Sequence, residues 1–299
     1  MSYLLHLVIY LNLYIIVALS LNLVVGYCGL ITLAHAGYFA IGAYAYALGA
    51  LKLGWSFFPA LGLGVVTAML LSLALSLPAW RFKRDVFVMV SLAVQAMLFG
   101  LIYNWYRPDS PLGSWFNFTN GPYGLSGVPK PAIAGSRIAT VGSFAAFSFV
   151  VAGVCALLVW TLARSPWGRL LKAIRDDELA ARGLGKNVRL AKVQVVAIAC
   201  GIVAVGGSMY AAYVSYVEPS IAALDFSILM LSMVIVGGVG NFRGPVIGAF
   251  VLLLIPEILR FVAIPDAVAP DIRTMAYGLL LVVFMHVRPK GIWGEYRLD

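Results

Sequence analysis

Three cysteines and three histidines are the side chains from which a metal site or a nucleophilic centre could be built. Cys28, Cys155 and Cys200 lie far apart, each in an apolar run and none with a second cysteine at a ligand spacing. Zinc sites require closely spaced ligand pairs, and disulfide frameworks require recurrent cysteines. We therefore expect packing cysteines, no metal site and no catalytic residue in this chain.

Recognisable catalytic motifs are also absent from the sequence. It contains neither a G-x-S-x-G elbow nor an H-E-x-x-H pair. The nearest approach to a nucleotide-binding phosphate loop is Gly185-Lys186, which is followed by Asn187 and lacks the upstream glycine. No cofactor is expected in this chain, and if ATP drives its activity, another chain must bind and hydrolyse the nucleotide.

The elements that would position any functional residue are membrane-spanning helices. Hydrophobic residues make up 62% of the chain, charged residues only 11%, and the mean hydropathy is +0.96. Ordinary soluble domains are about 45–50% apolar and about 25% charged. A helix needs roughly 20 apolar residues to cross a bilayer. The sequence therefore predicts an all-α, polytopic transmembrane helical bundle in which residues 1–299 form a single domain.

The predicted number of spans is about nine, with a range of roughly 8–10. They lie near residues 4–25, 27–51, 56–79, 86–106, 140–163, 192–217, 224–239, 245–263 and 273–287. Basic residues cluster at 81–84, 164–192 and 288–297, three segments that fall on one side of this arrangement. Because cytoplasmic loops carry an excess of Lys and Arg, this side is the cytoplasm, and the 107–139 loop is extracytoplasmic. The net charge of +9 then requires no nucleic-acid partner.

The segment 164–192 is polar and helix-prone between two apolar runs, and it holds eight basic and three acidic residues. Ser165 followed by Pro166 is a helix start, and we expect a helix through 167–182. Gly183 and Gly185 would end it, and Asn187 would cap a second helix. An ordinary solvated loop is the alternative. Docking of a partner is favoured by apolar residues that such a loop does not need: Leu170, Leu171, Ile174, Leu179 and Leu184.

Two candidates for a translocation pathway lie within the predicted spans. His35 is an ionisable side chain in an apolar run beside small residues, including Gly37, and such groups usually face a bundle interior or a pathway. A neutral histidine bonded to a neighbouring helix is the alternative. Tyr210 and Tyr213 lie three residues apart, in a stripe that Tyr216 continues, and could line a pathway, although interfacial anchoring explains Tyr216 equally well.

A third candidate is the glycine-rich stretch after the seventh predicted span. Residues 224–236 would extend only about 20 Å at 1.5 Å per residue, which is short for a bilayer. Pro245 is best placed in a first helical turn, so we expect a turn over 240–244 that is capped by Asn241. Gly240, Asn241 and Gly244 are therefore candidate gate or packing residues, and substrate binding is the alternative.

Three stretches together resemble one known family. They are GYCGLITLAHAGYFAIGAY at 26–44, GR…KAIRDDELAARGLGKNVRLAK at 168–192 and GGVGNFRGPVIGA at 237–249. They resemble the permease subunits of ABC importers for branched-chain amino acids, of the LivM type, and with the span spacing the likeness covers most of the chain. The resemblance implies a multi-pass protein of the bacterial cytoplasmic (inner) membrane.

The resemblance also implies partners and roles. They are a second homologous, LivH-like permease, two ATPase subunits that bind ATP and Mg, and a periplasmic or extracellular substrate-binding protein. The 164–192 segment would be the coupling segment that seats in the ATPase, through Arg175, Asp176, Asp177, Glu178, Ala180, Ala181 and Gly185. Glu178 to Gly185 resembles a one-residue-shifted form of the permease coupling motif. The expected substrate is a branched-chain or related hydrophobic amino acid; the alternatives are another small solute, such as urea or an aromatic acid, and an ion-coupled secondary transporter.

Overall fold

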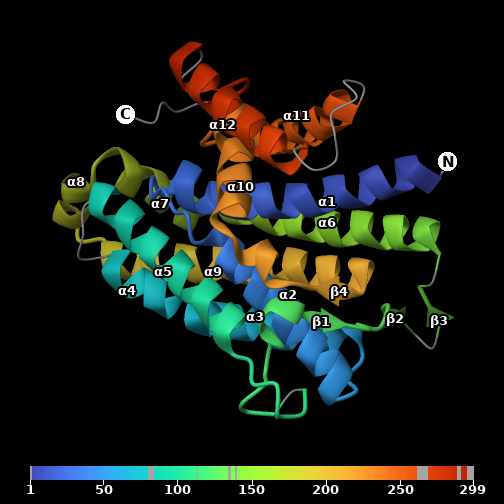
Figure 1. Ribbon diagram of the computed structural model, residues 1–299. Coiled ribbons are helices and arrows are strands. Elements are labelled where there is room, and N and C mark those ends of the chain that lie inside the picture. Colours follow the sequence, from blue (N-terminus) through green and yellow to red (C-terminus); the bar gives the residue numbers. More distant parts are fainter. Residues whose placement is uncertain are drawn as a thin grey trace.

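The protein is helical along most of its length (Figure 1). The computed structural model describes residues 2–79, 84–112, 114–133, 136–138, 140–260, 269–287 and 291–294. The long helices of these residues are α1 (Ser2–Asn22), α2 (His35–Lys52), α3 (Phe57–Leu71), α5 (Arg84–Asn104), α6 (Val141–Arg164), α9 (Val188–Val214), α10 (Leu224–Gly237), α11 (Arg243–Arg260) and α12 (Ala269–Val287). Shorter helices are α4 (Leu73–Ala79), α7 (Pro166–Asp176) and α8 (Glu178–Gly183). The predicted all-α fold is confirmed.

Length and hydropathy mark membrane spans in the described part of the chain. Five helical segments are long and apolar enough to cross a bilayer, namely Tyr3–Tyr27, Phe57–Ser76, Val86–Asn104, Val141–Arg164 and Val188–Val214. Three shorter apolar helices cover Leu224–Gly237, Arg243–Ile255 and Met275–Phe284. The chain is thus a multi-pass membrane protein, while the count of about nine spans stays a prediction.

The second predicted span begins later than expected. A π-helix, η1 (Leu23–Tyr27), continues α1, and residues 28–34 are not helical, so that α2 begins only at His35. Gly29 has a φ of 73°, a left-handed conformation that takes the chain out of the helix. The prediction of a helix from residue 27 is therefore wrong, and α2 starts inside the bundle.

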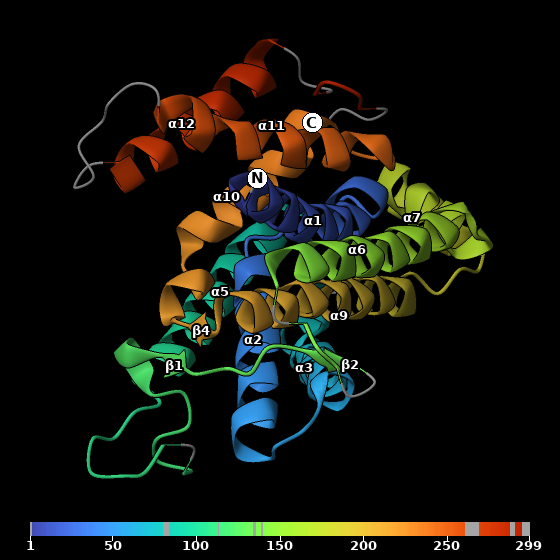
Figure 2. The same cartoon turned by 90° about the vertical axis from the view of Figure 1, so that its right-hand side faces the viewer.

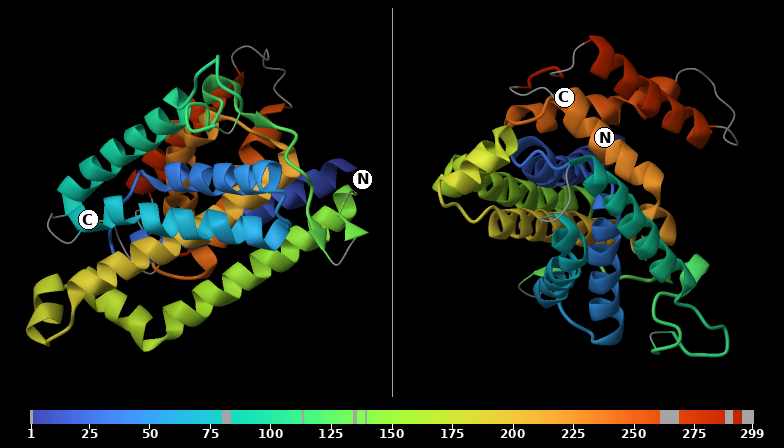
Figure 3. Two further views of the ribbon diagram at one scale, coloured as in Figure 1. Left: turned by 90° about the horizontal axis from the view of Figure 1, so that it is seen from below. Right: turned by 90° about the vertical axis from the view of Figure 1, so that its left-hand side faces the viewer.

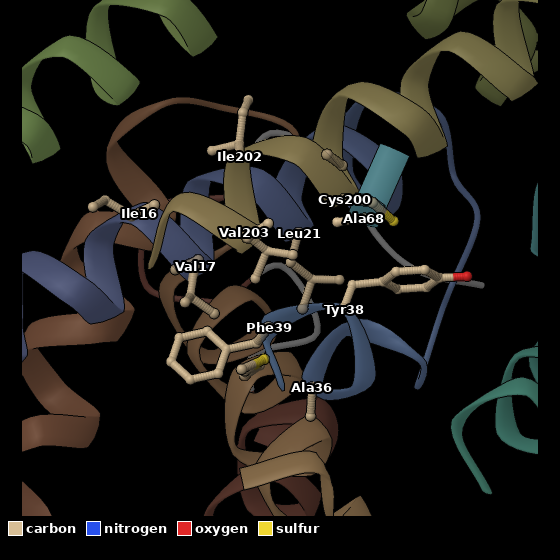
Figure 4. Close-up of a cluster of buried hydrophobic side chains, with 14 of the residues drawn as sticks. Ile16, Val17, Leu21, Ala36, Tyr38, Phe39, Ala68, Cys200, Ile202 and Val203 are labelled. Carbon is tan, nitrogen blue, oxygen red and sulfur yellow. The ribbon is translucent and has the colours of Figure 1, made fainter. Parts of the chain in front are cut away.

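The helices pack in layers. Figures 1 and 2 show α1, α6 and α9 running side by side along the long dimension of the molecule, with α11 and α12 over α1 and with α3 to α5 on the opposite side. The central helix is α2, which packs against α9 and α3. A Cβ at Gly207 of α9 would overlap the backbone of Phe39, so this glycine allows α2 and α9 to approach closely. Figure 4 shows side chains of α1, α2 and α9 converging in the core, among them Val17, Phe39 and Val203.

The two ends of the bundle differ in character. The amino terminus and the segment between α5 and α6 lie at one end, and α7 and α8 lie at the other, together with the end of α4 (Figures 1 and 2). The two segments thus lie at opposite ends of the bundle, and the assignment of the 107–139 loop to the outside and of the 164–192 segment to the cytoplasm stays a prediction. The basic residues Arg81, Lys83, Arg288, Lys290 and Arg297, which also served to predict that orientation, lie outside the described residues.

The segment between α5 and α6 contains short elements rather than a span. They are the 3-10 helix η2 (Gly121–Tyr123) and the strands β1 (Leu125–Ser126), β2 (Ala132–Ile133) and β3 (Ser136–Arg137). Strands β2 and β3 pair with each other, and β1 pairs antiparallel with β4 (Tyr216–Val217), with Leu125 opposite Val217. The pairing of β1 with β4 ties the outer segment to the end of α9. After β4 the chain forms η3 (Pro219–Ala222) and enters α10.

Candidate functional site

The 164–192 segment forms two helices before α9, and the predicted helix over 167–182 is interrupted. Ser165 caps α7 as expected, because its Oγ accepts a hydrogen bond from Gly168 N at 3.3 Å, and Pro166 occupies the first turn. Asp177 then leaves the helical conformation and caps α8, accepting from the amides of Leu179 and Ala180 at 2.9 and 3.0 Å. The prediction of one continuous helix is wrong because this aspartate caps a new helix.

The end of the segment follows the predicted turn chemistry. Gly185 has a φ of 73°, the left-handed conformation that ends a helix. Gly183 instead completes α8, so only one of the two predicted glycines makes the turn. Asn187 caps α9, as predicted, by accepting a hydrogen bond from Leu190 N at 3.1 Å. The helix, turn and helix expected on the cytoplasmic side are therefore present, with one additional break.

The inner face of the segment is anchored to the bundle. Leu171, Ile174 and Ala181 are buried. Glu178 forms ion pairs with Arg182 and with Lys192, whose Nζ lies 2.8 Å from Glu178 Oε2 and whose side chain is almost fully buried. The segment is thus held in one orientation relative to α9.

The outer face of the segment carries exposed apolar side chains. Leu179 and Leu184 are 76% and 79% exposed, and Asp176, Asp177 and Ala180 are also exposed. Of the apolar residues that predicted docking, these two leucines are available to a partner, whereas Leu171 and Ile174 pack inside. Of the residues assigned to coupling by resemblance, Gly185 is exposed, and Arg175 and Ala181 are buried, so that these two can act only through the permease itself.

Arg175 connects the segment to the membrane helices. Its Nη1 donates a hydrogen bond of 2.7 Å to the carbonyl of Gly26 in η1, and its Nε lies 3.0 Å from Asp176 Oδ1. A second contact is made by Lys172, whose Nζ lies 5.3 Å from the ring centroid of Tyr27. Because η1 leads directly into the loop before α2, Arg175 joins α7 to the part of the chain that precedes α2.

The predicted turn over 240–244 contacts the end of α1, where η1 begins. Asn22, at the end of α1, donates to the carbonyl of Asn241 at 2.7 Å and accepts from Gly240 N at 3.2 Å. Asn241 Oδ1 in turn accepts from Gly244 N at 2.6 Å, as expected for a cap. We call Asn22, Gly26, Arg175, Gly240 and Asn241 the cytoplasmic junction, since they link α1, α7 and the turn before α11 at the end of the bundle that is predicted to face the cytoplasm.

The amino end of α2 lies among buried polar side chains. His35 Nε2 is 2.8 Å from Ser20 Oγ of α1, and the histidine is only 2% exposed. The amide of Ala36 donates to Ser227 Oγ of α10 at 3.2 Å. A backbone helix end inside a membrane protein needs such partners, because lipid supplies none. His35 is therefore a packed and hydrogen-bonded histidine here, and its part in a pathway stays a prediction.

Gln95 is the residue of this cluster that sequence reasoning missed. Its Oε1 accepts from Gly37 N at 2.9 Å, and its Nε2 donates to the carbonyl of Ala222 at the end of η3. Gln95 is buried near the middle of α5 and so joins three elements at half the depth of a span. A lone glutamine inside an apolar run was the available signal. A Cβ at Gly37 would also lie only 2.7 Å from Leu98, so this glycine permits the approach of α5.

The tyrosines of α9 pack against other helices. Tyr213 hydrogen-bonds His6 of α1, and its ring centroid lies 5.0 Å from that of Phe144 of α6. The ring of Tyr210 lies 5.7 Å from that of Phe39 of α2. The predicted pathway residues are therefore found in three places, at the amino end of α2, at the cytoplasmic junction and on the outer half of α9, rather than in one site.

The comparisons with known proteins agree with one another. The profile of the family described as "Branched-chain amino acid transport system / permease component" matches residues 3–285. The high-affinity branched-chain amino acid transport system permease protein LivM of Escherichia coli K12 is 29% identical, over 93% of this chain and 67% of its own length. The probable LivM of Methanocaldococcus jannaschii is 25% identical over 95% and 91%. The autoinducer 2 import system permease LsrC of Salmonella typhimurium is 25% identical over 48% and 41%. No solved structure matches the chain.

Proposed function

The chain belongs to the family of branched-chain amino acid transport permease components, and on that premise we propose that it forms half of the translocation pathway of an ATP-driven importer for branched-chain or related hydrophobic amino acids. A second, homologous permease would complete the pathway. Two ATPase subunits would bind ATP and Mg, and a substrate-binding protein would deliver the amino acid to the outer face. The membrane would be the bacterial cytoplasmic membrane.

The observation that carries the proposal is the two-faced 164–192 segment. Its inner face is buried and bonded to η1 and α9, while its outer face presents Leu179 and Leu184 to the solvent. Two leucines exposed on one short segment are unfavourable in water, since burying such a side chain contributes roughly 1.5–3 kcal/mol. A cleft on the ATPase would cover both leucines, and α8, held by its cap and ion pairs, would move with the ATPase as a rigid body.

The cytoplasmic junction supplies a route from the ATPase to the pathway. A displacement of α8 would move α7, and the hydrogen bond from Arg175 to the carbonyl of Gly26 would transmit this movement to η1. π-helical turns are often found at functional sites, and η1 is followed at once by the non-helical residues 28–34 and by α2. We infer that closure of the ATPase pair shifts the amino end of α2 and thereby switches access between the two sides.

Two other functions are less well supported. A secondary transporter would be driven by an ion gradient and would need no ATPase, so that it would require no docking surface between its spans. Such a protein would also have no use for exposed leucines on a rigid cytoplasmic helix. Import of another small solute by the same machinery remains the alternative for the substrate, and the ligand of the partner binding protein distinguishes the two.

Cysteine cross-linking tests the docking surface. In the assembled transporter, the Leu179→Cys and Leu184→Cys variants should cross-link to the ATPase with a short bifunctional reagent, and ATP should change the yield. The Leu171→Cys variant is the matched control, because this leucine of α7 is fully buried and should not react. Absence of a cross-link from both exposed positions in a complex that still hydrolyses ATP would overturn the proposed docking.

A further inference from the structure

An apolar pocket opens on the outer side of α5 at half the depth of that helix. It has a volume of about 280 Å³ and is lined by Leu92, Gln95, Ala96, Phe99 and residues 222–224. These α5 residues lie in the middle of Arg84–Asn104, so the pocket is far from both ends of the span. An apolar cavity of about 150 Å³ is enough to hold benzene, and this pocket therefore has room for a branched aliphatic side chain.

Residues 222–224 on one side of the pocket belong to a segment that the chain brings into the membrane. From β4 at the outer end, the chain turns inward through η3, and the carbonyl of Ala222 accepts a hydrogen bond from Gln95. The first turn of α10 is held at the same depth, since Ser227 Oγ accepts from Ala36 N. Non-helical backbone at membrane depth is tolerated where protein buries it or where it lines a water-filled cavity.

The residue that follows the pocket lining in the chain is an aspartate. Asp225 directly follows Leu224, which lines the pocket, and it lies in the first turn of α10 on the exposed surface of the chain. A charged side chain facing lipid at the centre of a bilayer costs at least about 2.5 kcal/mol. The face that carries Asp225 is therefore turned to water or to another subunit rather than to lipid. If α10 began at the membrane surface, an aspartate in its first turn would simply lie in water. The hydrogen bond from Gln95 to the carbonyl of Ala222 instead places the start of α10 in mid-span.

We propose that the pocket and Asp225 form this subunit's half of the substrate site, in which the pocket receives the branched side chain and the Asp225 carboxylate pairs with the α-ammonium group. The inference rests on the proposed import of hydrophobic amino acids and adds the place and chemistry of recognition. The two parts match the two features of such a substrate, an apolar branch and a cation on the adjacent carbon.

Accessibility to a charged thiol reagent tests the exposure to water. With the three native cysteines replaced by alanine, the Asp225→Cys variant in the assembled transporter should react with a membrane-impermeant quaternary ammonium thiosulfonate, and leucine with its binding protein should slow the reaction. The matched control is Val154→Cys, which is 61% exposed at the middle of α6. Figure 3 shows α6 on the other side of the molecule from α5. The control should not react. If the thiol of Asp225→Cys were as unreactive as that of Val154→Cys, the proposal would be overturned.

Transport kinetics test the charge. Asp225→Asn should raise the KM for leucine uptake by about tenfold or more, equivalent to about 1.4 kcal/mol, while Asp225→Glu retains most of the uptake and Asp109→Asn, in the outer loop, changes nothing. Ala96→Phe should fill the pocket and reduce leucine uptake more than alanine uptake.

If the native transporter imports leucine but Asp225→Asn has a normal KM, or only fails to pair with the second permease, this inference is wrong and the proposed function stands. If the native transporter imports no hydrophobic amino acid, the proposed function itself fails.

Discussion

Removal of the Arg175 guanidinium should uncouple ATP hydrolysis from transport. Arg175 donates to the carbonyl of Gly26 at 2.7 Å, and its side chain is only 9% exposed. A hydrogen bond from a charged donor contributes about 1.5–3 kcal/mol, and a buried carbonyl left without a donor costs about 1–3 kcal/mol. Arg175→Met keeps much of the side-chain volume but loses this bond. We expect the link between α7 and η1 to weaken by about 2–4 kcal/mol, which is at least roughly 30-fold in the equilibrium between joined and separated states.

The assay is the number of leucine molecules imported per ATP hydrolysed by the complete transporter in proteoliposomes. Arg175→Met should keep the ATPase bound and active while this ratio falls severalfold. Arg169→Met is the control, because Arg169 is exposed on the same helix and its guanidinium donates only to the carbonyl of Arg164, at 3.3 Å, among its described bonds. An unchanged ratio for Arg175→Met in a fully assembled complex would refute the transmission of force through the cytoplasmic junction.

Three further predictions concern the interior of the bundle. Gln95→Leu removes both hydrogen bonds of the amide and should lower the free energy of unfolding by about 2–4 kcal/mol, measured by thermal denaturation in detergent. Gly207→Val forces α2 and α9 apart and should cost about 1–3 kcal/mol, whereas Gly153→Val, with nothing within 4 Å of its Cβ, should leave the melting temperature nearly unchanged. A double-mutant cycle of His35→Leu and Ser20→Ala should give a coupling energy of about 0.5–1.5 kcal/mol; additive effects would mean that the two side chains do not interact.

Local signals predicted helix ends well. Ser165, Asn187 and Asn241 each cap the element that the sequence assigned to them, because a cap depends on one side chain and the few amides that follow it. The break at Asp177 could not be foreseen. In the run Asp176-Asp177-Glu178 either aspartate can continue a helix or cap a new one, and the sequence does not tell which of the two residues makes the cap that Asp177 forms.

Depth within the membrane was the property that the sequence concealed. Residues 28–34 are mostly apolar, so hydropathy continues through a stretch that is not helical, and the start of α2 at His35 depends on contacts with α1, α5 and α10. For the same reason, the sequence alone indicates that Asp225 is the polar start of a span at the membrane surface. Only the bond between Gln95 and Ala222 shows that this start lies in mid-membrane, next to a pocket.

The most direct test of the importer function is uptake of radiolabelled leucine by the purified permease pair in proteoliposomes. With the ATPase inside, ATP enclosed and the binding protein outside, leucine should accumulate against its gradient, and omission of any one of the three should abolish accumulation. Accumulation by the permease pair alone, driven by a sodium or proton gradient without ATPase or ATP, would contradict the assignment of this chain as an ATP-driven importer subunit.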